Sequence, residues 1–259
     1  MSDLSVEVVL LLALAALAAG FVDAVVGGGG LIQLPALLLG LPSASPVQVL
    51  ATNKLASMCG TATSSVTYYR RIRPDPATFL PLMALALVGS FVGALGASHL
   101  PKEAFEPIVL VVLIVVGAYV LLRPDLGEET ALRFSGHRHR FAAMAVGFVI
   151  GVYDGLLGPG TGSFFVFALV GLLGYDFLQA SAKAKLANFA TNLGALLLFI
   201  PTGAVLWDVG LMMGACNLIG GYLGARTAVA RGSGFVRAFF IVVVSGFIIR
   251  IGGGLLGVW

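Results

Sequence analysis

The chain has 259 residues, of which 59% are hydrophobic and 10% are charged, with a mean hydropathy of +1.02. Because a soluble domain carries about 25% charged residues, this composition excludes an ordinary soluble globular protein. The net charge is only +3 and no nucleic-acid-binding motif is present, so a nucleic-acid partner is not expected. The composition predicts a multi-pass membrane protein in contact with membrane lipid.

Ten apolar segments follow one another along the chain. In the first half they span 4–23, 31–41, 46–69, 77–99 and 104–122. In the second half they span 141–157, 163–174, 177–199, 208–230 and 235–256. Most have about 20 residues, which is the length of a helix that crosses the hydrocarbon core.

The second segment of each set is too short to span the membrane alone, and it follows a glycine-rich stretch. We name these stretches the first break, residues 27–30, and the second break, residues 158–162. Either the first two segments of each set both cross the membrane, or they form a broken, re-entrant pair. We favour the broken pair, because irregular backbone at membrane depth survives only where protein surrounds it or where it lines a cavity.

Residues 20–119 repeat at 151–250 with a constant offset of 131 and no gap. Under this offset Asp23 corresponds to Asp154 and Lys54 to Lys185. The chain is therefore expected to contain a first transmembrane repeat at 1–122, a cytoplasmic linker at 123–140 and a second transmembrane repeat at 141–259.

Matching loops of the two repeats differ in charge. The loop at 70–73 has three arginines and its counterpart around 201–208 has no basic residue, whereas the loop around Lys102 has one and its counterpart at 226–237 has three. Because Lys and Arg collect in cytoplasmic loops, the repeats are predicted to have opposite orientations, with both chain termini outside the cytoplasm. We therefore predict an all-α membrane protein of two inverted-topology repeats, each with about five hydrophobic helices. This architecture is typical of secondary transporters with a site at the repeat interface.

Helix caps and packing motifs recur in both repeats. Ser45 before Pro46 predicts the start of one helix, and Asp176 lies at the equivalent position of the other repeat. The motif Gly89-x-x-x-Gly93 and its counterpart Gly220-x-x-x-Gly224 predict close helix packing without a chemical role.

A lysine lies in the middle of the third segment of each repeat. Lys54 comes nine residues after Ser45, about 13 Å into the expected helix. A lysine in hydrocarbon is costly unless it faces a cavity or a partner. Each lysine shares one face of its expected helix with two other polar residues. These are Ser57 and Thr61 for Lys54, and Asn188 and Asn192 for Lys185. Two interpretations remain open: the lysines bind a ligand, or they only neutralise Asp23 and Asp154.

The two breaks are candidates for anion binding. A helix that begins inside the membrane presents free backbone N–H groups and the positive end of its dipole, and glycine lets a ligand approach closely. Leu31 and Ser163 are expected to open the short helices. Asp23 and Asp154 precede the breaks, where they either carry coupling protons or hold the broken backbone.

The sequence FVDAVVGGGGLIQLPALLLGLPSASPVQVLATNKL and its echo GVYDGLLGPGTGSFFVFALVGLLGYDFLQASAKAKLANFATN resemble the TauE/SafE family of sulfite and organosulfonate exporters. The resemblance covers essentially the whole chain and implies transport of a small sulfur-containing anion. It also implies a role for these positions: Gly27 to Gly30, Thr52, Asn53, Lys54, Gly158 to Gly162, Lys185, Asn188 and Asn192.

We therefore expect a transporter that exports a small anion such as sulfite or an organosulfonate like sulfoacetate, with no cofactor and no metal. The candidate substrate-binding residues are Gly28, Gly29, Gly30, Thr52, Asn53, Lys54, Thr61, Gly160, Thr161, Gly162, Lys185, Asn188 and Asn192.

Two rivals remain. The first is a proton- or cation-coupled transporter of another small solute that uses Asp23 and Asp154. The second is a membrane-embedded enzyme, which no metal or nucleophile motif supports, and for which the histidines are expected to be loop residues, namely His99, His137 and His139.

Overall fold

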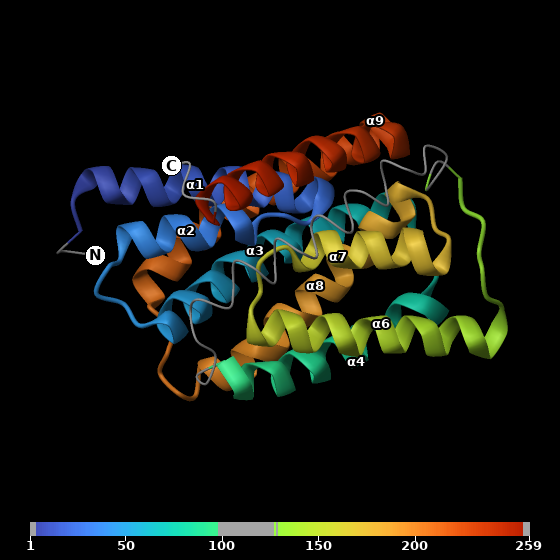
Figure 1. Cartoon of the computed structure of the whole chain (residues 1–259), viewed down its shortest axis with the longest axis horizontal. Helices are drawn as coiled ribbons and strands as arrows, with labels where there is room; N and C mark the ends of the chain where they lie inside the picture. Colours follow the sequence, from blue (N-terminus) through green and yellow to red (C-terminus); the bar gives the residue numbers. More distant parts are fainter. Residues whose placement is uncertain (1–3, 98–126, 128, 256–259) are drawn as a thin grey trace.

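A computed structural model of the chain describes residues 4–97, 127 and 129–255 (Figure 1). All regular structure in this part is helical, and several helices are strongly apolar, which confirms the expectation of an all-helical membrane protein. The expected segment at 104–122, the loop around Lys102 and His99 lie outside the described residues.

The first repeat contributes four described helices: α1 (Val6–Val26), α2 (Gly30–Gly40), α3 (Pro46–Ile72) and α4 (Pro76–Gly96). The predicted start of α3 is confirmed. The Ser45 hydroxyl accepts a hydrogen bond from the Gln48 amide, and the Gln48 side chain accepts one from the Ser45 amide. This capping box, with Pro46 in the first turn, fixes where α3 begins.

The second repeat contributes α6 (Gly136–Leu156), α7 (Thr161–Ala168), the π-helix η3 (Leu169–Leu173), α8 (Phe177–Phe199) and α9 (Trp207–Leu255). The predicted cap of α8 is also confirmed, because the Asp176 carboxylate accepts hydrogen bonds from the amides of Leu178 and Gln179. Helix α9 has two arms that meet at Gly232, whose φ of 75° and ψ of −174° are not helical.

Three local expectations were wrong. His137 and His139 lie in the first turns of α6 and not in a loop, because α6 begins within the predicted linker, before the apolar sequence starts. Residues 226–237 are helical apart from Gly232, so this basic stretch is a bend between two helical arms. The short helices begin at Gly30 and Thr161, slightly before the expected Leu31 and Ser163.

Within the described residues, three helices are long and apolar enough to cross a membrane: Val6–Val26, Pro76–Gly96 and Trp207–Gly246. Helices α2 and the α7–η3 segment are apolar but short. Helices α3 and α8 are long enough but more polar, since they carry the lysines and asparagines that the sequence singled out.

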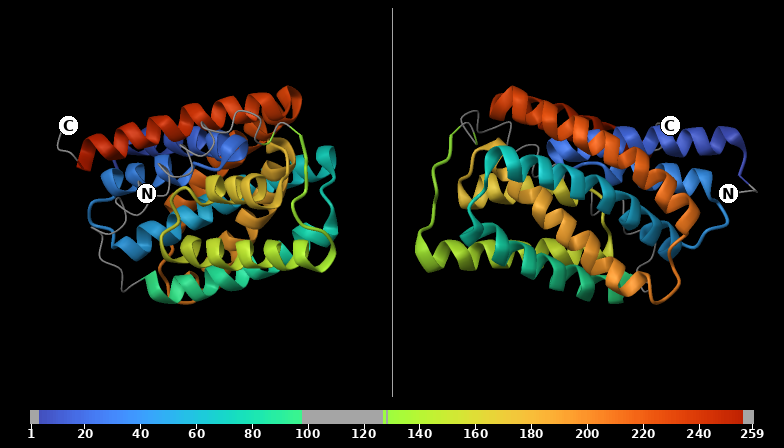
Figure 2. Two further views of the ribbon diagram at one scale, coloured as in Figure 1. Left: turned by 45° about the vertical axis from the view of Figure 1, so that its right-hand side comes forward. Right: turned by 180° about the vertical axis from the view of Figure 1, so that it is seen from behind.

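Helices α3 and α8 form the centre of the described structure, and most of their residues are buried. Around them, α1 packs against α9 and α6 packs against α4. Figure 1 shows α1 and α6 running in opposite directions along the long axis, and Figure 2 shows the molecule from two further sides. The first helix of each repeat therefore packs against the fourth helix of the other repeat.

Glycines make these outer contacts close. A Cβ atom placed on Gly93 of α4 would lie 2.1 Å from the Val152 carbonyl oxygen of α6. At the equivalent positions, a Cβ on Gly224 of α9 would lie 2.4 Å from the carbonyl oxygen of Phe21 in α1. The packing role predicted for the Gly-x-x-x-Gly motifs is confirmed, since real Cβ atoms do not approach backbone so closely.

The first prediction concerns Gly93→Ala. The added methyl group forces α4 and α6 apart, so we expect the free energy of unfolding to fall by about 1–3 kcal/mol. A thermal melt of the purified protein in detergent measures this loss as a lower melting temperature. Gly234→Ala is the matched control, because a Cβ there meets no atom within 4 Å and the backbone is helical. Equal melting temperatures for the two variants would contradict the close-packing argument.

Candidate functional site

The two breaks meet at the centre of the protein. The Ser163 amide donates to the Gly27 carbonyl oxygen at 3.0 Å, and the Ser163 hydroxyl donates to the Val26 carbonyl oxygen at 2.9 Å. Gly27 has a φ of 87°, and a Cβ on it would lie 2.0 Å from the carbonyl carbon of Gly162. Glycine is required here both for the left-handed backbone and for the direct contact between the breaks.

Several backbone N–H groups in the breaks have no acceptor. Within the described part of the chain, the following amides donate no hydrogen bond: Gly28, Gly29, Gly30, Gly160 and Gly162. The first amides of a helix lack intrahelical acceptors, and the helix dipole places partial positive charge beside them. The openings of α2 and α7 therefore offer hydrogen-bond donors to an anion.

Each central lysine forms an ion pair with an aspartate of the other repeat. Lys54 Nζ lies 2.6 Å from Asp154 Oδ2, and both side chains are only 2% exposed. Lys185 Nζ lies 3.1 Å from Asp23 Oδ2 and also donates to the Asp23 carbonyl oxygen. The two pairs are equivalent under the repeat offset. The lysines thus neutralise the aspartates, and ligand binding by the lysines stays a prediction.

A small cavity of about 20 Å³ lies between these groups. Its lining comes from α1, α3, α6, α8 and the two breaks, and consists of Asp23, Gly27, Gly30, Asn53, Lys54, Ser57, Asp154, Gly158, Gly160, Thr161, Gly162, Asn188 and Asn192. A cavity of this size holds about one water molecule. The centre of the structure is therefore tightly packed.

Most of the candidate site residues line this cavity, and five do not: Gly28, Gly29, Thr52, Thr61 and Lys185. The Thr52 hydroxyl instead accepts a hydrogen bond from the Leu206 amide, ahead of α9. The Thr61 hydroxyl accepts one from the Asn192 side chain at 3.4 Å, which joins the two polar stripes at equivalent positions.

Asn53 is the one cavity residue whose side chain is buried without a partner in the described structure. It is 3% exposed, its Oδ1 atom has no hydrogen bond, and its side-chain nitrogen donates none. Buried amides are nearly always hydrogen-bonded, and the oxygen and nitrogen of an amide exchange places by a rotation of the group. Asn53 is therefore ready to bond a group that enters the cavity.

The sequence did not single out several polar residues around this centre. The Tyr153 hydroxyl donates to the Pro159 carbonyl oxygen of the second break at 2.6 Å. Asn217 of α9 donates to Gln33 of α2 at 2.6 Å, and both side chains are buried. The only signal for these residues was a polar side chain within an apolar helix, which does not show whether the partner is a ligand or another helix.

A second polar cluster was also missed, at the end of the protein where α3 meets α4. Lys183 Nζ lies 3.1 Å from Asp75 Oδ1 and 3.9 Å from the centre of the Tyr175 ring. The Tyr175 hydroxyl is hydrogen-bonded to His139 at 2.9 Å and to Thr78 at 3.1 Å. In the other repeat, the counterparts of Asp75, Thr78 and Tyr175 are apolar, namely Leu206, Val209 and Ala44.

This cluster shifts the titration of its loop residues. Burial raises the pKa of Tyr175 to about 12, so its hydroxyl stays protonated and can donate. Burial acts to raise the pKa of Asp75 too, but hydrogen bonds from Thr78 and the charge of Lys183 outweigh it and hold that pKa below its ordinary value. Asp75 is therefore ionised at neutral pH and pairs with Lys183.

The second prediction separates pairing from ligand binding at Lys54. Lys54→Met leaves the Asp154 carboxylate buried without a counter-charge, so we expect a loss of about 3–5 kcal/mol in the free energy of unfolding. The double variant Lys54→Met with Asp154→Leu removes both charges and is expected to recover most of that loss. Thermal melts of the three proteins in one detergent make the comparison.

The equivalent variant Lys185→Met tests whether the loss of stability depends on how deeply the unpaired aspartate is buried. Asp23 is 14% exposed, whereas Asp154 is 2% exposed, so water reaches the Asp23 carboxylate more easily. We expect a smaller loss for Lys185→Met than for Lys54→Met. A double variant no more stable than Lys54→Met alone would contradict the pairing argument.

Comparison with known proteins identifies the family of the chain. The family model described as Sulfite exporter TauE/SafE matches residues 12–251. The chain is 36% identical over 252 residues to a probable membrane transporter protein ORF9 of Sinorhizobium sp, covering 97% of this chain and 95% of that protein. It is 38% identical over 229 residues to the probable membrane transporter protein YfcA of Escherichia coli K12, covering 88% of this chain and 83% of the relative. These relatives are membrane transporters and not enzymes, and the chain belongs to the TauE/SafE family of membrane transporters.

Proposed function

We propose that this protein exports a small sulfur-containing anion, such as sulfite or an organosulfonate like sulfoacetate, across the cell (inner) membrane. The observation that carries the proposal is the unpaired, buried side chain of Asn53 beside the free amides of the two breaks. The free break amides are hydrogen-bond donors, and the Asn53 side chain can also donate once its amide group rotates, so the cavity offers donors to an oxyanion beside the Asp23 and Asp154 carboxylates. The family description names sulfite, and that name supports the substrate class.

We further propose that residues 1–122 and 141–259 form two inverted repeats about this site, joined by a linker. Three observations support the symmetry. The ion pairs Lys54–Asp154 and Lys185–Asp23 are equivalent under one offset, and so are the close contacts of Gly93 and Gly224. The antiparallel course of α1 and α6 supports the inversion (Figure 1). Inverted repeats place the substrate site at their interface.

We propose that the end of the molecule with the α3–α4 loop faces the cytoplasm and that both chain termini lie on the other side. The loop between α3 and α4 and the bend of α9 around Gly232 lie at this end (Figure 1), and each carries arginines, at 70, 71 and 73 and at 226, 231 and 237. Basic residues collect on the cytoplasmic side. Export then follows the interior-negative potential, which is worth about 2.3 kcal/mol per charge for each 100 mV.

Transport requires the centre to open. The cavity of about 20 Å³ has room for about one water molecule, so a larger anion needs the two breaks to move apart. Such a movement separates Ser163 from Gly27 and changes both ion pairs, because all of these contacts join one repeat to the other. We propose that the structure is an occluded state between access to the two sides.

The third prediction tests the site through Asn53→Ala. Asn53 has no partner to lose, so we expect the melting temperature to change little. The affinity for the transported anion is expected to fall about 2- to 12-fold, as for the loss of one neutral hydrogen bond. A thermal-shift titration with sulfite, sulfate, thiosulfate, sulfoacetate and carboxylates measures both quantities. Thr227→Ala, on the outer side of α9, is the control.

Two results would overturn the proposal. One is anion binding by the wild type that stays unchanged in Asn53→Ala, since the cavity would then not be the site. The other is stabilisation by carboxylates with none by any sulfur-containing anion, since the substrate class would then be wrong.

A second candidate is a proton- or cation-coupled transporter, and a specific observation favours it. Asp23 and Asp154 both line the cavity, and each forms an ion pair with a lysine that an anion would otherwise contact. An anion that takes a lysine leaves a buried carboxylate unpaired, and protonation of that carboxylate removes the cost. Coupling predicts that a pH gradient alone drives anion uptake into proteoliposomes, and that Asp154→Asn abolishes this dependence. Equal transport with and without the gradient would contradict proton coupling. It would favour a uniporter, which exports the anion along the membrane potential without another ion.

A further inference from the structure

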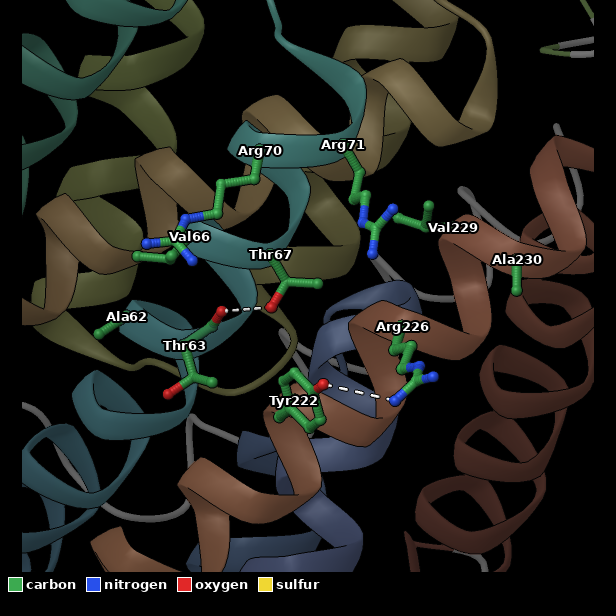
Figure 3. A pocket seen from close by; sticks show the side chains of 10 residues that line it. All are labelled: Ala62, Thr63, Val66, Thr67, Arg70, Arg71, Tyr222, Arg226, Val229 and Ala230. Atoms are coloured by element: carbon green, nitrogen blue, oxygen red, sulfur yellow. Dashed lines mark hydrogen bonds between the residues drawn. The ribbon is translucent and has the colours of Figure 1, made fainter.

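A groove of about 760 Å³ lies between the second half of α3 and the first arm of α9, away from the central cavity. Figure 3 shows its two walls, with Arg71 of α3 and Arg226 of α9 entering from opposite sides. The walls belong to different repeats, so a ligand in this groove would bridge them. The groove contains none of the residues that line the cavity.

Polar and apolar groups are separated along the α3 wall of the groove. This wall runs from Ala62 to Arg71, about 13 Å along the helix axis. Arg70 and Arg71 lie where α3 terminates, and the part before them offers apolar or small side chains such as Val66, which is 51% exposed. Arg226 of the facing wall comes three residues before Val229. A ligand that fills this groove needs both a charged group and an apolar part.

The arginines of the groove are available to an anion. Within the residues that the structure describes, Arg70, Arg71 and Arg226 form no ion pair, and Arg226 donates only a long hydrogen bond of 3.4 Å to the Tyr222 hydroxyl. Three guanidinium groups around one groove match the oxygens of a phosphate group.

The charge of this groove is confined to one end of the protein. Under the repeat offset, Arg70 corresponds to Pro201, Arg71 to Thr202 and Arg226 to Leu95. The equivalent surface at the opposite end therefore has no basic residue at these three positions. The asymmetry fits an anionic headgroup on the side with the basic loops, where anionic lipid attracts basic residues.

We propose that this groove binds an anionic phospholipid. The headgroup phosphate lies between Arg71 and Arg226, with Arg70 beside it, and an acyl chain lies along Val66 and Ala62. The lipid joins α3, which carries Lys54, to α9. An inorganic anion would use the arginines but would leave the apolar length of the groove empty, so a lipid accounts for both parts.

The proposal is tested with the purified protein in detergent, by thermal melts with added phosphatidylglycerol, added phosphatidylcholine or inorganic phosphate, and by native mass spectrometry of bound lipid. The wild type is expected to be stabilised by phosphatidylglycerol and not by the other two. The double variant Arg71→Gln with Arg226→Gln is expected to bind phosphatidylglycerol roughly 30-fold more weakly. Ala230→Trp, which fills the groove but keeps the arginines, is expected to lose binding as well.

The matched control is Arg133→Gln with Arg138→Gln, which removes the same charge from exposed positions outside the groove. It is expected to keep the wild-type lipid affinity. Equal losses in the groove and control variants would overturn the proposal in favour of general surface charge. Full binding by Ala230→Trp, or stabilisation by inorganic phosphate equal to that by the lipid, would overturn it in favour of a site for a soluble anion.

Discussion

A lysine that is shielded from water is stabilised by a carboxylate beside it. In this protein each central lysine pairs with an aspartate of the other repeat. The Lys54 ammonium group is paired with Asp154, and Lys185 is paired with Asp23, so neither repeat can neutralise its own lysine with these groups. The same pairs hold the two breaks against each other. The contact of Gly27 with the second break joins the same two repeats, and both ion pairs involve the buried helices α3 and α8.

The ion pairs also limit what a ligand can do. A ligand shifts a conformational equilibrium only by its difference in affinity for the two states. An anion that bonds the break amides without disturbing the pairs gains little from opening the repeats. One that replaces a carboxylate at a lysine changes the contact that keeps the centre closed. Under the proposed function, binding and movement are coupled because they use the same side chains.

Much of this arrangement could be predicted from the sequence, because the repeat supplies two copies of each signal. Helix starts at Pro46 and Phe177, the glycine contacts and the position of the lysines all follow from local patterns. The partners could not be predicted, because the offset does not say whether Lys54 pairs within its repeat or across it. The cluster of His139 and Tyr175 was missed for a related reason. Its members come from separate helices, and each alone resembles an ordinary polar residue near a loop.

The exchange of partners between repeats has a consequence for biosynthesis. Helix α1 leaves the ribosome before α9, yet the close backbone contact that α1 makes at Phe21 is with Gly224 of α9. The Gly27 carbonyl oxygen of the first break likewise accepts its hydrogen bond from the Ser163 amide, which is synthesised much later. Contacts between residues so distant in sequence form late, because the intervening chain must be synthesised and inserted first. The early helices must therefore remain in the bilayer with incomplete packing until the second repeat has been synthesised.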